Sequence, residues 1–176
     1  LDTNSEYINY ASMTNTGNLV INSILTNSDT LTNSVGGMLS NNGTVNNSGT
    51  FDNNDTFSNS STFTNSGTLN ALPESEINNN GLLTNSGTLS LGFQSAINNN
   101  ASLNNSGLMD GGGLITNNGV LNNTGSVDLT NRIYNEAGGT ITNADGTLTA
   151  SYIENYGTMN IDGGSVALET LVNDGT

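Results

Sequence analysis

Apolar residues recur along this chain at intervals of about six positions, separated by runs of Asn, Ser, Thr and Gly. The pattern is clearest in the segments NNSGTF (46–51), TNSGTL (64–69) and TNSGTL (84–89). Equivalent segments begin 18 or 20 residues apart, which is about three six-residue units. A unit this short buries its apolar residue only against the units stacked on it. We therefore predict an all-β fold, a three-sided parallel β-helix of about nine coils.

Three columns of apolar residues appear when the chain is divided into such coils. The first column contains Met13, Leu31, Phe51, Leu69, Leu89, Met109, Val127, Leu148 and Val166. The second contains Leu19, Leu39, Phe57, Ile77, Ile97, Ile115, Ile133, Ile153 and Leu171. The third contains Leu25, Val45, Phe63, Leu83, Leu103, Leu121, Ile141 and Met159. None of these positions is polar, so we expect all three columns to face one core, with the three Phe residues in a single layer.

An Asn stands two positions after most residues of the second and third columns. Because strand side chains alternate between two faces, these Asn residues also point inward or lie at a corner. We predict two ladders in which each side-chain amide bonds to the amide of the next coil. The first ladder contains Asn27, Asn47, Asn65, Asn85, Asn105, Asn123 and Asn143. The second contains Asn41, Asn59, Asn79, Asn99, Asn117, Asn135 and Asn155, and Asn173 extends it.

The segment between the first and second columns is the irregular one. The positions that match the ladders there become Ala71, Leu91, Gly111, Leu129, Ala150 and Leu168. The extra residues of the longer coils mostly fall there too, at 32–39, 70–77 and 90–97, and around 128–141 the long segment moves to the third side. These departures are where a specific site is expected. We expect Phe93 to cover Leu91 as a local plug, with an interface anchor as the alternative.

The segments TNSGTL, TNNGVL (116–121) and TNADGTL (142–148) resemble the β-helical repeats of filamentous-haemagglutinin-like adhesins, large secreted proteins of Gram-negative bacteria and cyanobacteria. The resemblance covers roughly residues 26–176. It implies a right-handed helix, secretion to the cell surface, and a role in adhesion, aggregation or surface fibres. We expect residues 1–25 to form a less regular first coil and residues 26–176 to form a single domain. We interpret the chain as a segment of a longer protein or as a fibre subunit.

A left-handed hexapeptide helix is the alternative architecture. Its acyltransferase family places a small residue directly after the inward aliphatic one, and its catalytic members rely on His. Here that place is held by residues such as Thr64, Asn46 and Asp52, and the chain contains no His. The right-handed form is therefore favoured.

Charge narrows the range of partners. The formal net charge is −14 and Arg132 is the only basic residue. Nucleic-acid binding is excluded as a function because phosphate neutralisation requires Lys and Arg.

No segment is long and apolar enough to span a bilayer. The chain has no Cys, so it needs no disulfides, and its acidic, Lys-free, Thr- and Asn-rich composition is common among secreted bacterial surface proteins. We expect an extracellular or cell-surface location.

Carboxylates are the remaining chemical candidates. Asp128, Glu136 and Asp145 could supply oxygen ligands to calcium, but a solvated acidic surface that keeps the protein soluble is the favoured explanation. Arg132, between Asp128 and Glu136, marks the one candidate catalytic cluster with a basic group. Without His, Lys or Cys the options for acid–base chemistry are narrow, so we do not expect an enzyme and no other cofactor is predicted.

The function expected from these features is a structural or adhesive module that associates with itself end to end or with flanking repeats. A glycan- or ice-binding solenoid that contacts host or cell surfaces is the alternative. A polysaccharide lyase or hydrolase is the less favoured third. The outward Thr residues form no unbroken Thr-x-Thr column, which disfavours ice.

Overall fold

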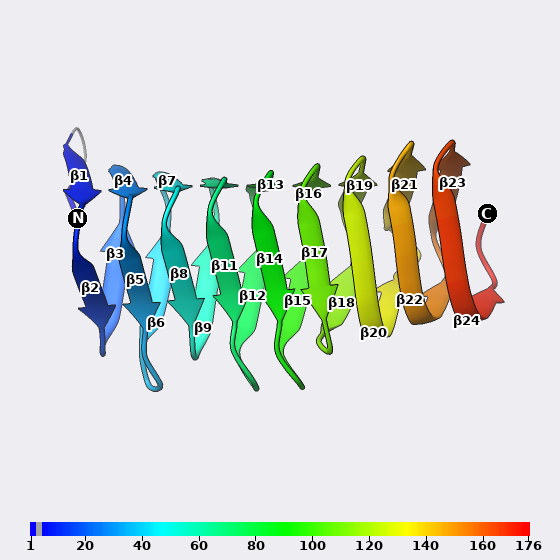
Figure 1. Cartoon of the computed structure of the whole chain (residues 1–176), viewed down its shortest axis with the longest axis horizontal. Coiled ribbons are helices and arrows are strands. Elements are labelled where there is room, and N and C mark those ends of the chain that lie inside the picture. The colour runs from blue at the N-terminus through cyan, green and yellow to red at the C-terminus, as the bar shows by residue number, and fades with distance from the viewer. Residues whose placement is uncertain (3–4) are drawn as a thin grey trace.

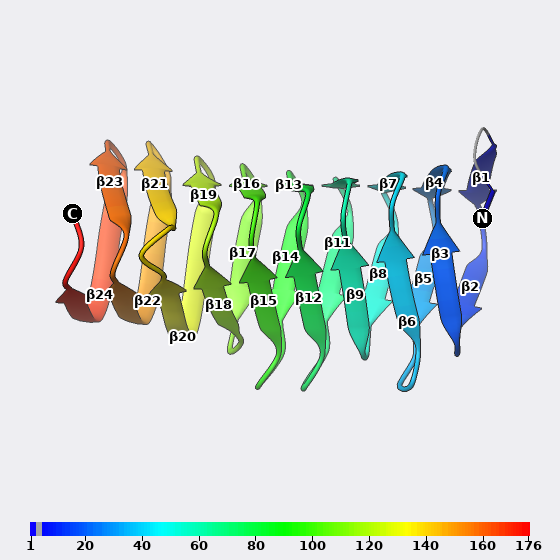
Figure 2. The same ribbon diagram turned by 180° about the vertical axis from the view of Figure 1, so that it is seen from behind.

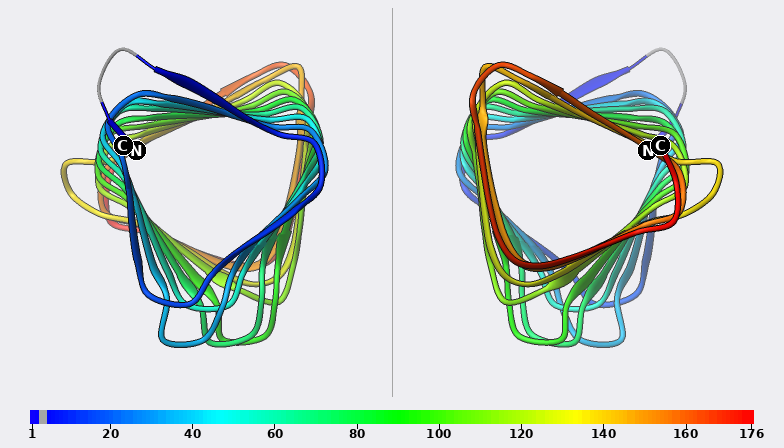
Figure 3. Two further views of the ribbon diagram at one scale, coloured as in Figure 1. Left: turned by 90° about the vertical axis from the view of Figure 1, so that its left-hand side faces the viewer. Right: turned by 90° about the vertical axis from the view of Figure 1, so that its right-hand side faces the viewer.

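The computed structural model describes residues 1–2 and 5–176, which form a β-solenoid of parallel coils stacked along one axis (Figure 1). The described residues contain strands and turns but no helix, and so no helix that could cross a membrane. In the end-on view from the N-terminus the chain turns clockwise as it recedes from the viewer (Figure 3). The solenoid is therefore right-handed, which confirms the favoured prediction.

Each coil contributes one strand, or part of one, to each of three faces. The first face contains β2 (Ser12–Asn15), β5 (Thr30–Asn33), β8 (Thr50–Asn53), β11 (Thr68–Ala71), β14 (Thr88–Leu91) and β17 (Leu108–Gly111). The second face contains β3 (Asn18–Ile21), β6 (Met38–Asn41), β9 (Thr56–Asn59), β12 (Glu76–Asn79), β15 (Ala96–Asn99) and β18 (Leu114–Asn117). The longer strands β20 (Ser126–Asn135), β22 (Thr147–Asn155) and β24 (Ser165–Asn173) bend across both of these faces.

The third face is a separate sheet of nine parallel strands, which gives the predicted nine coils. Its strands are β1 (Glu6–Asn9), β4 (Ile24–Asn27), β7 (Thr44–Asn47), β10 (Thr62–Asn65), β13 (Leu82–Asn85), β16 (Ser102–Asn105), β19 (Val120–Asn123), β21 (Thr140–Ala144) and β23 (Thr158–Asp162). The register along each face pairs equivalent residues, for example Phe63 with Leu83 and Leu83 with Leu103. All three predicted apolar columns are confirmed.

Most strands have four residues that alternate between half-buried and fully buried positions. The outward positions at strand starts are often Thr, whose β-branched side chain suits a pleated surface. In most strands the inward positions hold one apolar residue and one Asn. Phe51, Phe57 and Phe63 form one fully buried layer with ring centroids 5.0–6.0 Å apart, which confirms the expected aromatic layer.

Glycine at the corner between the third and first faces permits the coils to stack closely. A Cβ atom on Gly87 would lie 2.1 Å from the carbonyl oxygen of Gly67, which belongs to the preceding coil. The same clash would arise at Gly107 against Gly87. The repeated Gly of the sequence motif therefore provides space for the neighbouring backbone.

The corner between the first and second faces carries the protruding turns, which extend from the lower edge in Figures 1 and 2. In three of these turns one residue adopts a left-handed backbone, namely Gly36, Glu74 and Gln94. From β20 onward the corner is a bend within one strand, and the long turn moves to 136–139, before the third face, as the sequence predicted. Phe93 lies at a turn tip with 70% of its surface exposed. The plug expected over Leu91 is therefore wrong, because the turn carries Phe93 away from the coil.

Candidate functional site

Both predicted asparagine ladders are confirmed and lie inside the solenoid. In the first ladder the Nδ2 of Asn65 donates to the Oδ1 of Asn85 at 2.8 Å, and Asn85 donates to Asn105 at 2.8 Å. Each amide also donates to backbone carbonyls near the corner, as Asn65 does to Thr88 at 2.8 Å. Except for Asn173 in the last coil, which is exposed, the ladder residues are buried, and their amides satisfy carbonyls that would otherwise face the apolar core. Their role is structural.

A third, shorter asparagine ladder lies on the first face, and it was not predicted from the sequence. Asn15 donates to Asn33 at 2.8 Å, and Asn33 donates to Asn53 at 2.9 Å. The next residue in register is Ala71, so this ladder stops there. The signal was present in the sequence, since Asn15, Asn33 and Asn53 each stand two positions after a residue of the first column.

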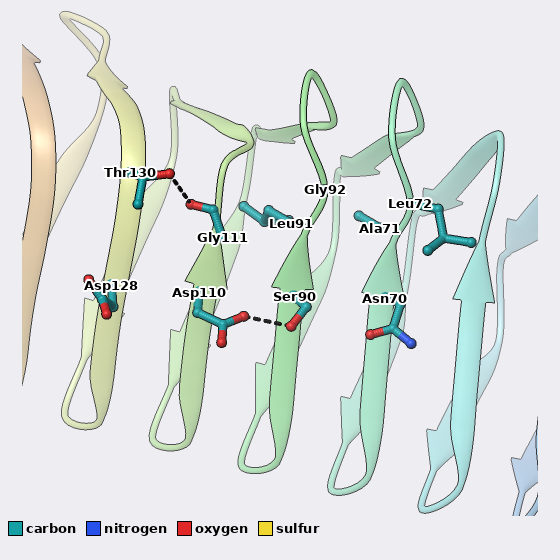
Figure 4. Close-up of a pocket in the computed structure, with 10 residues that line it drawn as sticks. All are labelled: Asn70, Ala71, Leu72, Ser90, Leu91, Gly92, Asp110, Gly111, Asp128 and Thr130. Carbon is teal, nitrogen blue, oxygen red and sulfur yellow. Dashed lines mark hydrogen bonds between the residues drawn. The ribbon is translucent and has the colours of Figure 1, made fainter.

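An open groove lies on the outside of the first face, beside the positions where the third ladder is missing (Figure 4). It has a volume of about 410 Å³, and Leu91 and Gly111 are among the residues that line it. Ser90 Oγ donates to Asp110 Oδ1 at 2.6 Å, and Thr130 Oγ1 donates to the carbonyl of Gly111 at 3.4 Å. A second hollow of about 330 Å³ shares Asp128 and Thr130 with it and continues toward the C-terminal coil.

The groove is acidic because two carboxylates line it. Asp110 and Asp128 are partners in register on adjacent coils. No basic side chain lines either hollow. This arrangement disfavours anionic ligands.

The three calcium candidates are on different elements. Asp128 lies on β20 on the first face, Glu136 is in the turn after β20, and Asp145 is in the turn between β21 and β22. Across residues 1–2 and 5–176, no three His, Cys, Asp or Glu side chains are grouped so as to hold a metal ion. The structure therefore does not bring the predicted calcium ligands together.

Arg132 belongs to a cluster on the second face that the sequence reasoning only partly anticipated. Its guanidinium carbon lies 4.6 Å from the ring centroid of Tyr152 and 5.5 Å from that of Tyr134. Its Nη1 lies 3.4 Å from Oε1 of Glu154. The rings of Tyr134 and Tyr156 are stacked with centroids 6.2 Å apart. The partner of Arg132 is thus Glu154, whereas the predicted cluster placed it with Asp128 and Glu136.

Glu154 dominates the electrostatics of this cluster. It points outward but is only 8% exposed, because the surrounding side chains cover it. Hydrogen bonding to Glu154 and loss of hydration raise the pKa of Tyr134 above its ordinary value. The negative charge of Glu154, together with loss of hydration, raises the pKa of Tyr156. Both phenols are therefore neutral near pH 7.

Alignment of the coils could have found this cluster. Arg132 pairs in register with Tyr152, and Tyr134 pairs with Glu154. These are outward positions on neighbouring coils, so their side chains must meet on the surface. The sequence reasoning aligned the inward columns only.

The two end coils expose the cross-section of the core. At the C-terminal end a hollow of about 240 Å³ is lined by residues that include Met159, Val166 and Leu171. At the other end a hollow of about 250 Å³ is lined by residues that include Tyr7 and Met13. Equivalent residues are fully buried in the middle coils.

No protein-family model, curated protein or solved structure matches this chain.

Proposed function

We propose that this chain is a structural module of an extracellular fibre or adhesin, extended end to end through its two terminal coils. The observation that carries the proposal is the exposed core at both ends. Leu171 belongs to the second apolar column yet is 49% exposed, whereas Ile153, one coil earlier, is fully buried. Exposed apolar cross-sections and unpaired strand edges favour the addition of further coils.

The apolar columns continue if one copy stacks on the next in the same register. Met159 then meets Tyr7 in the third column, and Val166 meets Met13 in the first. Each contact places an apolar residue on an apolar residue, as within the solenoid. The contact is therefore stabilised mainly by the hydrophobic effect and by backbone hydrogen bonds.

The asparagine ladders do not continue across such a junction. Ile161 stands where the first ladder would supply its next Asn, since it pairs in register with Asn143, and it would face Asn9 of the next copy. Leu168 would likewise face Asn15.

Leu1 already covers part of the N-terminal face, because the N–H of Asn22 donates to the carbonyl of Leu1 at 3.2 Å. The contact between identical copies is therefore weaker than the contact between adjacent coils of one copy. Flanking repeats with matching Asn residues would fit the two end coils better than a second copy does.

The extracellular location and the absence of catalysis are parts of this proposal. Composition supports the location, since the chain is acidic, has no Lys and is rich in Thr and Asn. The lack of His, Lys and Cys and the pairing of Arg132 with Glu154 leave few groups for proton transfer.

Sedimentation of the 176-residue chain over a wide range of concentration tests the proposal. We expect weak, reversible association that added salt does not weaken. Ile161→Asn should strengthen association, because the new amide can donate to Asn9 of the next copy. Val166→Glu should weaken it by placing a charge against Met13.

Phe93→Ser is the matched control, because Phe93 is exposed on the side of the solenoid and should not affect stacking. Thermal unfolding of each variant shows whether the end coil remains folded. A chain that stays monomeric at every concentration, both unchanged and as Ile161→Asn, would contradict end-to-end association.

A further inference from the structure

The cluster around Arg132 concentrates the side chains that are scarce elsewhere in this chain. It contains the only basic residue and three of the five Tyr residues, Tyr134, Tyr152 and Tyr156. All lie on two adjacent coils, on β20, β22 and the turn after β22. A regular structural rod does not require such a grouping, because the same outward column holds Asn78, Asn98 and Thr116 in earlier coils.

The cluster combines ring surfaces with hydrogen-bonding groups. Tyr134, Tyr152 and Arg132 are half-buried, and Tyr156 is 41% exposed. A hollow of about 220 Å³ beside them is lined by Leu114, Asn131, Arg132 and Tyr134. Tyr presents a rigid apolar ring and a polar hydroxyl at little entropic cost, and such residues often anchor binding surfaces.

Charge compensation decides which ligands fit. Glu154 pairs with Arg132 at 3.4 Å, so the guanidinium offers hydrogen-bond donors while its positive charge is largely cancelled. The rest of the chain carries a formal charge of −14. An anionic ligand would meet an unfavourable field here, whereas a neutral ligand rich in hydroxyl groups would not.

We propose that Tyr134, Tyr152, Tyr156 and Arg132 form a binding surface for neutral glycans. The apolar face of a pyranose ring packs against the tyrosine rings, and its hydroxyl groups accept from the guanidinium and exchange hydrogen bonds with the phenols and Asn131. The surface is pre-organised, because its strands are fixed by pairing on both sides and Arg132 is held by Glu154 and two rings. The site is on the side of the solenoid and does not depend on end-to-end stacking.

Titration calorimetry of the 176-residue chain with cellohexaose, laminarihexaose and mannohexaose tests this inference. The chain has no Trp, so tyrosine fluorescence gives a second signal from the same titration. We expect at least one of these neutral oligosaccharides to bind, with an affinity that salt does not change. Tyr134→Ala and Tyr152→Ala should each weaken binding by about tenfold, as loss of an anchoring aromatic residue does at other interfaces.

Two further variants separate binding from folding. Tyr134→Phe keeps the ring and should weaken binding less than Tyr134→Ala. Tyr10→Ala removes a 74% exposed tyrosine in the first coil and should leave binding unchanged. The inference is overturned if none of the three sugars binds, if Tyr134→Ala binds as well as the unchanged chain, or if only an acidic sugar such as a galacturonate oligomer binds and salt abolishes its binding.

Discussion

Asn53 pairs in register with Ala71, and at this step the third asparagine ladder ends. Asn53 accepts a bond from Asn33 but donates only to backbone carbonyls, to Asp55 at 2.8 Å and Glu76 at 3.1 Å. In the first ladder, Asn65 has side-chain partners in both neighbouring coils. The two residues are equally buried, so they allow the contribution of a single ladder bond to be measured.

Asn65→Ala should lower the free energy of unfolding by about 1 kcal/mol more than Asn53→Ala does, because it breaks one more buried side-chain hydrogen bond. Chemical denaturation of both variants measures the difference. Asn100→Ala is the control, since Asn100 is exposed and should change stability little. Equal losses for Asn53 and Asn65 would show that the amide-to-amide bond adds nothing.

Gly87→Ala should destabilise the protein by more than about 2 kcal/mol, because the new Cβ would lie 2.1 Å from the carbonyl oxygen of Gly67. Gly17→Ala provides the comparison, since a Cβ there meets no atom within 4 Å. Thermal unfolding should show a large loss for the first variant and almost none for the second. A mild effect at Gly87 would mean that the coils can separate to accommodate a methyl group.

Phe57→Ala should lower stability by about 3–5 kcal/mol, because it opens a cavity within the fully buried layer formed with Phe51 and Phe63. Phe93→Ala removes the same side chain from an exposed turn and should change stability by no more than about 0.5 kcal/mol. Denaturant titration of both variants measures the contrast. Comparable losses would place Phe93 against the core in solution.

Glu154→Gln should lower the pKa values of both Tyr134 and Tyr156, because Glu154 is the largest cause of their elevation. Phenolate absorbance during an alkaline titration measures the change. In the unchanged chain the unfolded state releases these protons first, so the folded state binds more protons above the ordinary tyrosine pKa of about 10. The stability that these two phenols contribute should therefore be fully present below pH about 10, and it should be lost as pH rises through their folded-state pKa values. If Glu154→Gln leaves the titration unchanged, Glu154 is not the cause.

The inward half of this structure could be derived from the sequence. The apolar columns, the two long ladders and the number of coils follow from a period of 18–20 residues and from the alternation of side chains in strands. Each inward side chain faces the residue at the equivalent position of the coil above and of the coil below. One correctly placed repeat therefore determines the next, and residues such as Leu83 and Asn85 could be placed without coordinates.

The outward half was decided by the tertiary structure. The conformation of the turns carries Phe93 into solvent, because a left-handed residue at Gln94 directs the turn away from the coil. The register between β20 and β22 sets Tyr152 beside Arg132 and Glu154 beside Tyr134. Outward positions do not repeat in residue type, so the columns show which of them are neighbours in register but not how their side chains pack. The packing of Arg132 between the rings of Tyr152 and Tyr134, and the burial of Glu154, come only from the tertiary structure.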